Sequence, residues 1–152
     1  MIPFFVMLGV IIAVRGAGAL GMDAMDSWLA ATRVGLAVMF AFTGVAHFNR
    51  MRDDLIRMVP PQLPNPAGLV TLTGAAELAG AIGLLVPTVA RWAAIGLIFL
   101  LVVMFPANIH AARSGVTLGG RRATPLAIRL PLQLVWIGLL CWVAASRALS
   151  AW

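Results

Sequence analysis

The sequence predicts an all-α, polytopic membrane protein, and its composition and the arrangement of its apolar residues carry this prediction. Of its 152 residues, 62% are hydrophobic and only 11% are charged, whereas soluble domains are about half apolar and about a quarter charged. The apolar residues also form five long runs, and a helix needs about 20 such residues to cross a bilayer. We therefore expect residues 1–152 to form a single membrane domain.

The five expected spans are separated by residues that end helices or resist burial in lipid. Asp23 and Asp26 follow the first run, the stretch VPPQLPNPAG precedes the third, and Pro87 stands between the third and the fourth. The stretch RSGVTLGGRR precedes the fifth run, and glycine and proline commonly end helices. These signals place the spans near 2–22, 29–48, 68–87, 90–109 and 125–146.

The distribution of arginine predicts the orientation, because short cytoplasmic loops carry an excess of basic residues. The loops 49–67 and 110–124 hold three arginines each, whereas the charged residues of the loop 22–28 are all acidic. Both arginine-rich loops are therefore expected on the cytoplasmic side. This places the N-terminus in the cytoplasm and the C-terminus outside.

The first span has a second interpretation, as the apolar region of a secretory signal. Its first residues, MIPFFVMLGVIIAV, lack the basic segment that such signals carry. A retained helix is the favoured interpretation. Cleavage would leave the other four helices in the same orientation. The topology therefore does not distinguish a retained first helix from a cleaved signal.

Composition argues against several classes of function. The arginines are scattered, and nucleic-acid binding needs basic residues clustered on a solvated face. Cys141 is the only cysteine, which excludes an internal disulfide and a cysteine-built metal site. His47 and His110 are far apart in sequence and neither has an acid-rich motif, so we predict no metal site. Any redox role would need a bound cofactor or a partner.

The stretch GAGALG, residues 16–21, matches the spacing of a dinucleotide-binding turn. That turn needs a preceding strand and a soluble βαβ unit. Here the glycines fall inside an apolar helix, where small residues let neighbouring helices approach closely. We interpret the stretch as a packing feature.

Polar residues mark the cytoplasmic half of the last four spans, because consecutive spans run in opposite directions. Residues four apart share one face of a helix, and three pairs have this spacing. At about 1.5 Å per residue, the deepest of these side chains would lie roughly 12 Å inside the boundary. The residues, taken span by span, are Thr43 and His47, Thr73 and Glu77, Asn108 and His110, and Arg129 and Gln133.

Glu77 and Arg129 are expected to face inward as counter-ions, since a charge that faces lipid at that depth costs about 2.5 kcal/mol or more. Two interpretations of Glu77 stay open, a ligand or proton site and a structural hydrogen bond. For His47, a position where its helix leaves the bilayer is the simpler explanation.

Arg15 and Arg33 lie toward the opposite, outer ends of their spans. Both are long enough to extend outward to the headgroups. Arg15 is also close enough in sequence to bind Asp23, Asp26 or an anionic lipid.

The same polar residues stand in blocks that resemble the DoxX family of small bacterial membrane proteins. The blocks are FTGVAHF, VPPQLPNP, TGAAELAGAIGLLVP, FPANIHAA and RLPLQ, in that order, between about residues 29 and 137. The resemblance implies a four-helix transmembrane bundle in the bacterial inner membrane, with the first helix as an extra N-terminal one. It also implies an association with redox systems, although the family has no agreed catalytic motif to map onto this chain.

These observations together favour a membrane subunit of a redox system that binds a quinone or a similar apolar ligand. In this hypothesis Glu77 and His47 exchange protons, and Arg129 and Asn108 hold the oxygens of the ligand. Gln133, Thr43 and Thr73 complete the polar site, and the apolar walls come from Phe40, Phe105 and Trp136. The partners would be membrane lipids and a redox protein on the cytoplasmic side.

Two alternatives belong to other classes of function. One is a protein that binds or transports a lipid or a small amphiphile without any chemistry. The other is a membrane anchor that recruits a soluble enzyme through the arginine-rich loops.

The orientation is tested by cysteine labelling in a variant that lacks Cys141. A cysteine at Ser114 should react with a membrane-impermeant maleimide only after the inner membrane is permeabilised, whereas one at Ser27 should react in intact spheroplasts. Labelling of Ser114→Cys from outside would reverse the orientation.

Overall fold

The computed structural model describes residues 1–22, 26–122 and 124–146, and these residues are helical apart from turns, connecting segments and one small hairpin. Five helical segments are long and apolar enough to cross a membrane. They are α1 (Ile2–Ala19), α2 (Trp28–Ala46), α4 (Pro66–Leu85), α5 (Pro87–Val103) continued by α6 (Phe105–Ser114), and α7 (Leu126–Ala145). The smaller elements are α3 (Arg52–Met58) and an antiparallel pair of strands, β1 (Thr117–Leu118) and β2 (Arg121–Arg122).

The five expected spans correspond to these helices, with ends that differ by a few residues. The expected loops are more structured than the sequence indicated. The segment 49–67 contains α3, whose first turn holds Asp53 and Asp54 and whose last turn holds Arg57. This placement of charge complements the helix dipole. A helix of seven residues, about two turns, is too short to show a clear apolar period in the sequence.

Local side chains fix several helix ends. The hydroxyl of Ser27 accepts a hydrogen bond from the amide of Ala30 at 2.9 Å and begins α2. The side chain of Asn65 accepts one from the amide of Gly68 at 3.0 Å and begins α4. Asn65 has a φ of 49°, a left-handed conformation that asparagine adopts more readily than most residues. These caps satisfy amide groups that have no partner inside the helix.

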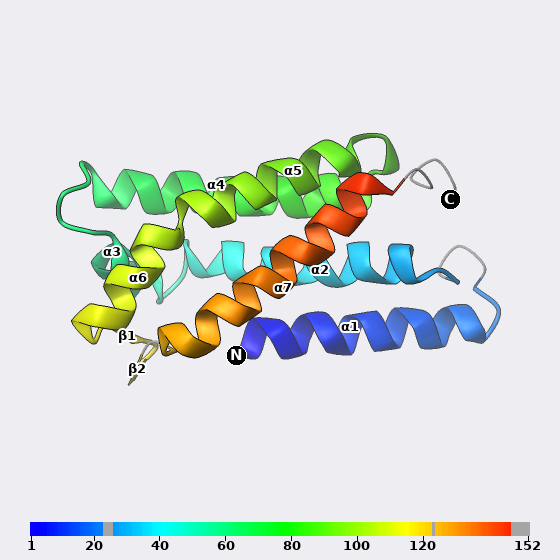
Figure 1. The fold of residues 1–152 in the computed structure, drawn as a ribbon, viewed down its shortest axis with the longest axis horizontal. Coiled ribbons are helices and arrows are strands. Elements are labelled where there is room, and N and C mark those ends of the chain that lie inside the picture. The colour runs from blue at the N-terminus through cyan, green and yellow to red at the C-terminus, as the bar shows by residue number, and fades with distance from the viewer. Residues whose placement is uncertain (23–25, 123, 147–152) are drawn as a thin grey trace.

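Helix α2 lies at the centre of the molecule, between α1 and α4, and α7 crosses it (Figure 1). It is the most buried of the five long helices. Its core positions, among them Leu36, Met39 and Phe40, pack with side chains from the other long helices. At one end of the bundle, at the left of Figure 1, α3, α6 and the strands gather over the ends of the long helices.

The helix is interrupted at Met104, between the end of α5 and the beginning of α6. Pro106 stands in the first turn of α6, and proline is tolerated there because its missing N–H would have no helical partner. Helix α6 then departs toward α3. This break places Asn108 beside the end of the bundle rather than in line with α5.

The long helices present apolar side chains to the outside. Residues more than 60% exposed include Ile12, Leu72, Ile82, Trp92 and Phe99, a pattern that suits contact with lipid. The exposed tryptophans Trp28, Trp92 and Trp142 stand at the same end of the bundle, as interfacial anchors do. Trp152 lies outside the described residues.

Helices α1 and α2 approach each other closely at Gly35. A Cβ atom there would lie 2.5 Å from Ile11 Cγ1 and 3.0 Å from the carbonyl oxygen of Met7. In the GAGALG stretch, Gly18 is buried in α1, but Gly16 faces open space. The stretch therefore lies largely in an apolar helix, as expected, and a glycine of the other helix, Gly35, makes a close approach to α1.

Arg15 and Arg33, which are expected from the sequence to lie in the outer half of their spans, behave differently. Arg15 pairs with Asp26 at 2.6 Å, one of the partners expected for it. The expectation that Arg33 extends to the headgroups is wrong, because Arg33 is only 2% exposed. Its Nε donates a hydrogen bond to the carbonyl oxygen of Leu84 at 2.9 Å. Leu84 lies in the last turn of α4, where carbonyl groups have no helical partner and a cation is favoured.

Substitution of Gly35 by alanine tests the close packing of α1 on α2. Gly35→Ala should lower the melting temperature in detergent, because overpacking costs about 1–3 kcal/mol and outweighs the better helix propensity of alanine, about 1 kcal/mol. Gly96→Ala is the matched control, since nothing lies within 4 Å of a Cβ at Gly96. It should leave stability unchanged or raise it. Equal effects of both variants would contradict the packing described.

Candidate ligand-binding site

A buried histidine and a buried glutamate face each other between α2 and α4. His47 follows the last residue of α2, Glu77 lies in the middle of α4, and each is 4% exposed. His47 Nε2 lies 3.9 Å from Glu77 Oε2. Within the part of the chain that the structure describes, Glu77 Oε2 is buried and has no hydrogen-bond partner. His47 is therefore the nearest group that can share a proton with it.

The other ring nitrogen of His47 is committed to the backbone. Nδ1 lies 2.8 Å from the carbonyl oxygen of Val70, and a carbonyl oxygen only accepts hydrogen bonds. Nδ1 therefore carries a hydrogen and donates it to Val70. The hydroxyl of Thr73 lies 3.3 Å from the same nitrogen and donates to carbonyl groups of its own helix. This arrangement turns Nε2 toward Glu77.

Two glycines make room for the pair. A Cβ at Gly74 of α4 would lie 2.4 Å from His47 Cβ, so only glycine admits the imidazole at this point. A Cβ at Gly44 of α2 would lie 2.9 Å from the side chain of Leu78 and 3.3 Å from Glu77 Cβ. Gly74 of α4 thus faces His47, and Gly44 of α2 faces Glu77 and its neighbour Leu78. Small residues allow membrane helices to approach this closely.

Thr43 and Arg52 complete the surroundings of the pair. The hydroxyl of Thr43 lies beside the carboxyl group of Glu77 and donates to the carbonyl oxygen of Phe40 at 3.2 Å. Arg52 of α3 donates hydrogen bonds to the carbonyl oxygen of His47 at 3.1 Å and to the hydroxyl of Thr71 at 3.0 Å. It thereby links the end of α2 to the beginning of α4.

His47 lies one residue beyond the span formed by α2. Burial lowers the pKa of its imidazole, because a charge is poorly solvated there. The hydrogen bond to the carbonyl of Val70 acts in the opposite direction, and the nearby charge of Arg52 lowers the pKa further.

A second polar network connects α6 and α7. Arg129 Nη1 donates to Asn108 Oδ1 at 2.7 Å, and Asn108 Nδ2 donates to Gln133 Oε1 at 3.4 Å. Gln133 Nε2 in turn donates to the carbonyl oxygen of Leu101 at 2.8 Å. Because the amide oxygen of Asn108 is held by Arg129, the orientation of its amide group is fixed.

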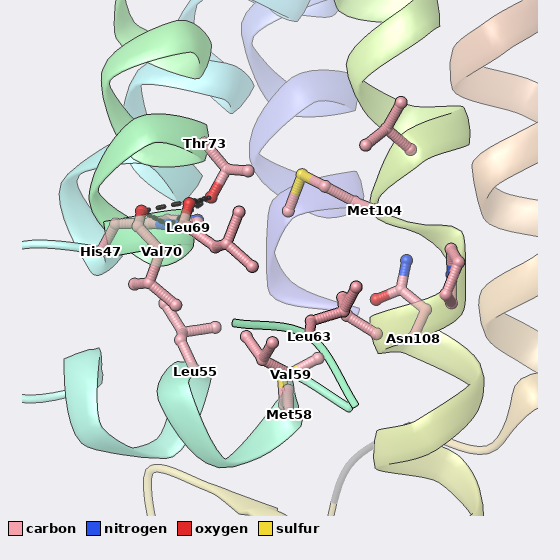
Figure 2. A pocket seen from close by; sticks show the side chains of 13 residues that line it. His47, Leu55, Met58, Val59, Leu63, Leu69, Val70, Thr73, Met104 and Asn108 are labelled. Atoms are coloured by element: carbon pink, nitrogen blue, oxygen red, sulfur yellow. Dashed lines mark hydrogen bonds between the residues drawn. The ribbon is translucent and has the colours of Figure 1, made fainter. Parts of the chain in front are cut away.

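A cavity of about 110 Å³ lies between the two networks. His47 and Thr73 line one side of it and Asn108 lines the opposite side, as Figure 2 shows. The other lining residues are apolar, and they come from α3 and the segment that follows it, from the first two turns of α4, and from the α5–α6 break. They are Leu55, Met58, Val59, Leu63, Leu69, Val70, Val103, Met104, Pro106 and Ala107.

The structure corrects three expectations about this site. Glu77 does not pair with Arg129: among the described residues its ionisable neighbour is His47, and Arg129 bonds to Asn108. Glu77 does not line the cavity either, since His47 stands between it and the cavity. The walls expected from Phe40, Phe105 and Trp136 are absent from the lining. The break at Met104 and the fold of α3 supply other apolar residues instead.

Of the eight polar residues singled out in the sequence, seven fall into the two networks. Thr43, His47, Thr73 and Glu77 belong to the first; Asn108, Arg129 and Gln133 belong to the second. His110 stands apart, on a more exposed part of α6, within 3.3 Å of the hydroxyl of Ser114. Among the residues that the structure describes, no three histidine, cysteine or acidic side chains gather closely enough to hold a metal ion.

The fold and the cavity define a class of protein, a small bundle of apolar helices with a partly polar cavity at one end. Residues 36–145 match a family described as a domain of unknown function (DUF8561), and the chain belongs to this family. The match begins within α2 and includes every residue of both polar networks, whereas α1 lies outside it. No curated protein and no solved structure matches the chain.

A double-mutant comparison tests the separation of the two networks. His47→Gln and Glu77→Gln should be non-additive by about 0.5–3 kcal/mol in the free energy of unfolding, as is usual for groups in contact. Arg129→Leu and Glu77→Gln should be additive within about 0.5 kcal/mol, because they disturb different networks. Unfolding of the purified variants by SDS in mixed micelles measures both. Recovery of stability when Glu77→Gln is added to Arg129→Leu would show instead that these two residues pair.

Proposed function

We propose that the chain is a DoxX-like inner-membrane protein that binds a quinone, or a similarly apolar ligand with oxygen acceptors, in the cavity. One observation carries this proposal: an otherwise apolar cavity has hydrogen-bonding groups on two opposite sides, Thr73 with His47 on one and Asn108 on the other. A quinone head has the matching chemistry, a flat apolar ring with one carbonyl oxygen at each end.

The donors of the cavity suit two carbonyl oxygens. The amide nitrogen of Asn108 has two hydrogens, and one long bond, to Gln133 at 3.4 Å, engages only one of them. The hydroxyl of Thr73 rotates freely about its C–O bond, so it can donate to a ligand in place of its own helix. Arg129 acts as a positioning residue in this arrangement, because it holds the oxygen of Asn108 and so fixes the orientation of its amide group.

The size of the cavity agrees with one ring. Its volume is about 110 Å³, of the same order as the cavity of about 150 Å³ that takes up benzene in an engineered protein. An alkyl tail would leave the cavity toward the apolar outer surface. A bound quinone supplies electron transfer, for which the chain's own side chains offer no group; the chain binds, orients and shields the ring.

The proposed orientation places the cavity near the cytoplasmic surface, at the end of the bundle where Arg50, Arg57 and Arg113 are exposed. These arginines could bind an acidic face of a redox partner, with the quinone as the carrier between the partner and the membrane. The chain would then act as a membrane subunit rather than as a complete enzyme.

Binding of decylubiquinone to the purified protein in mild detergent tests the proposed function. Asn108→Ala should weaken binding by about tenfold, the equivalent of one hydrogen bond of about 1.4 kcal/mol. Arg129→Leu should weaken it to a similar extent through Asn108. His110→Ala is the matched control, since His110 lies on the same helix as Asn108 but outside the cavity, and it should bind like the wild type.

Titration with 1-decanol separates the quinone from a general amphiphile, because both probes carry the same alkyl tail. Binding of decylubiquinone alone, with the expected losses, supports the proposal. Equal binding of both probes, insensitive to Asn108→Ala, would make the protein an amphiphile binder. No binding of either would refute the ligand site.

A further inference from the structure

We propose that His47 and Glu77 form a binding site for one exchangeable proton, and that ligand occupancy of the cavity is linked to that proton. The inference rests on the proposed ligand site and adds to it. It gives Glu77 a role in ligand binding although Glu77 does not line the cavity. Three observations carry it: the tautomer of His47, the burial of both groups, and the position of His47 between Glu77 and the cavity.

The hydrogen bond to Val70 locates the exchangeable proton. His47 Nδ1 keeps its hydrogen because its partner is a carbonyl oxygen 2.8 Å away. The second proton of the ring can therefore come and go only at Nε2, which lies 3.9 Å from the unpartnered Oε2 of Glu77. A proton on either atom lies in the same small space between the two side chains.

Burial favours one proton in that space. With one proton the pair has no net charge, whether the proton is on the carboxyl group or on the imidazole. With none the pair carries one negative charge, and with two it carries one positive charge. An uncompensated charge is costly where the side chains are only 5% and 6% exposed.

Of the charged groups around His47, Arg52 acts on the pair, because its positive charge opposes a second proton on the imidazole. From α3, Arg52 directs its guanidinium group to the carbonyl oxygen of His47 and to α4, on the outer side of the pair. From α6 and α7, His110 and Arg129 bond to Ser114 and Asn108 instead. Glu77 is the ionisable partner that α4 supplies.

Ligand binding is linked to the proton because His47 both lines the cavity and faces Glu77. A ligand that fills the cavity removes water from the imidazole and increases the cost of a net charge on the pair. The ligand should therefore bind best to the one-proton state. It follows that binding should take up one proton at alkaline pH, where the empty site has lost it, and release one at acid pH, where the empty site holds two.

Measurement of the dissociation constant of decylubiquinone between about pH 5 and pH 9.5 tests the linkage. The oxidised probe has no titratable group in this range. In the wild type, binding should be tightest at intermediate pH and should weaken on the alkaline side, approaching about tenfold per pH unit as one proton is lost. Calorimetry in two buffers of different ionisation enthalpy should show uptake of one proton in that limb.

Glu77→Gln should remove the alkaline limb, because the neutral imidazole of His47 then has no acid to pair with and no further proton to lose. Asp53→Asn is the matched control: it also removes a carboxylate at this end of the bundle, but from an exposed position of α3, and it should keep the limb.

The outcomes separate this inference from the proposed function. An alkaline limb that vanishes in Glu77→Gln and persists in Asp53→Asn supports the linkage. Binding that is independent of pH in the wild type, or a limb unchanged in Glu77→Gln, would overturn the linkage while leaving the ligand site intact. An absence of binding at every pH would refute the proposed function itself.

Discussion

The close contact between α2 and α4 is the constraint on which the rest of the structure depends. Gly44 and Gly74 let the two helices approach until His47 and Glu77 lie between them, shielded from solvent. An uncompensated buried charge is costly, and the imidazole and the carboxyl group lie 3.9 Å apart, so this contact constrains the rotation and the relative height of both helices. Arg52 and Arg33 reinforce it near opposite ends through backbone carbonyl groups.

The cavity arises because the chain cannot pack as tightly at the end of the bundle. Pro106 and the break at Met104 carry α6 away from the line of α5, and α3 covers the space that remains. The two polar networks then meet the same space from different helices. Arg129 holds Asn108 on one side, and Val70 holds His47 on the other. Polar groups on two opposite sides of an otherwise apolar cavity suit a small ring with two acceptors.

The five spans and the inward position of the polar residues could be predicted, because both follow from length, hydropathy and the cost of charge in lipid. The partners of each residue could not. Helical spacing places Glu77 and Arg129 at similar depth, but the order of helices around the bundle decides that Glu77 meets His47 and Arg129 meets Asn108. Arg33 was misplaced for the same reason, since its partner Leu84 is 51 residues away in sequence. The lining of the cavity depends on a break at Met104 that the apolar pattern does not reveal.

Photolabelling with an azido-quinone tests most directly whether one cavity between the two networks binds the ligand. The purified protein would be irradiated with the probe, digested and mapped by mass spectrometry, with and without excess decylubiquinone. The cavity predicts competed labels on both of its sides, in the segment that contains Leu55 to Leu63 and in the segment that contains Val103 to Asn108. Labels confined to outward-facing residues such as Phe99 or Ile82, or labels that excess decylubiquinone does not displace, would contradict a specific site.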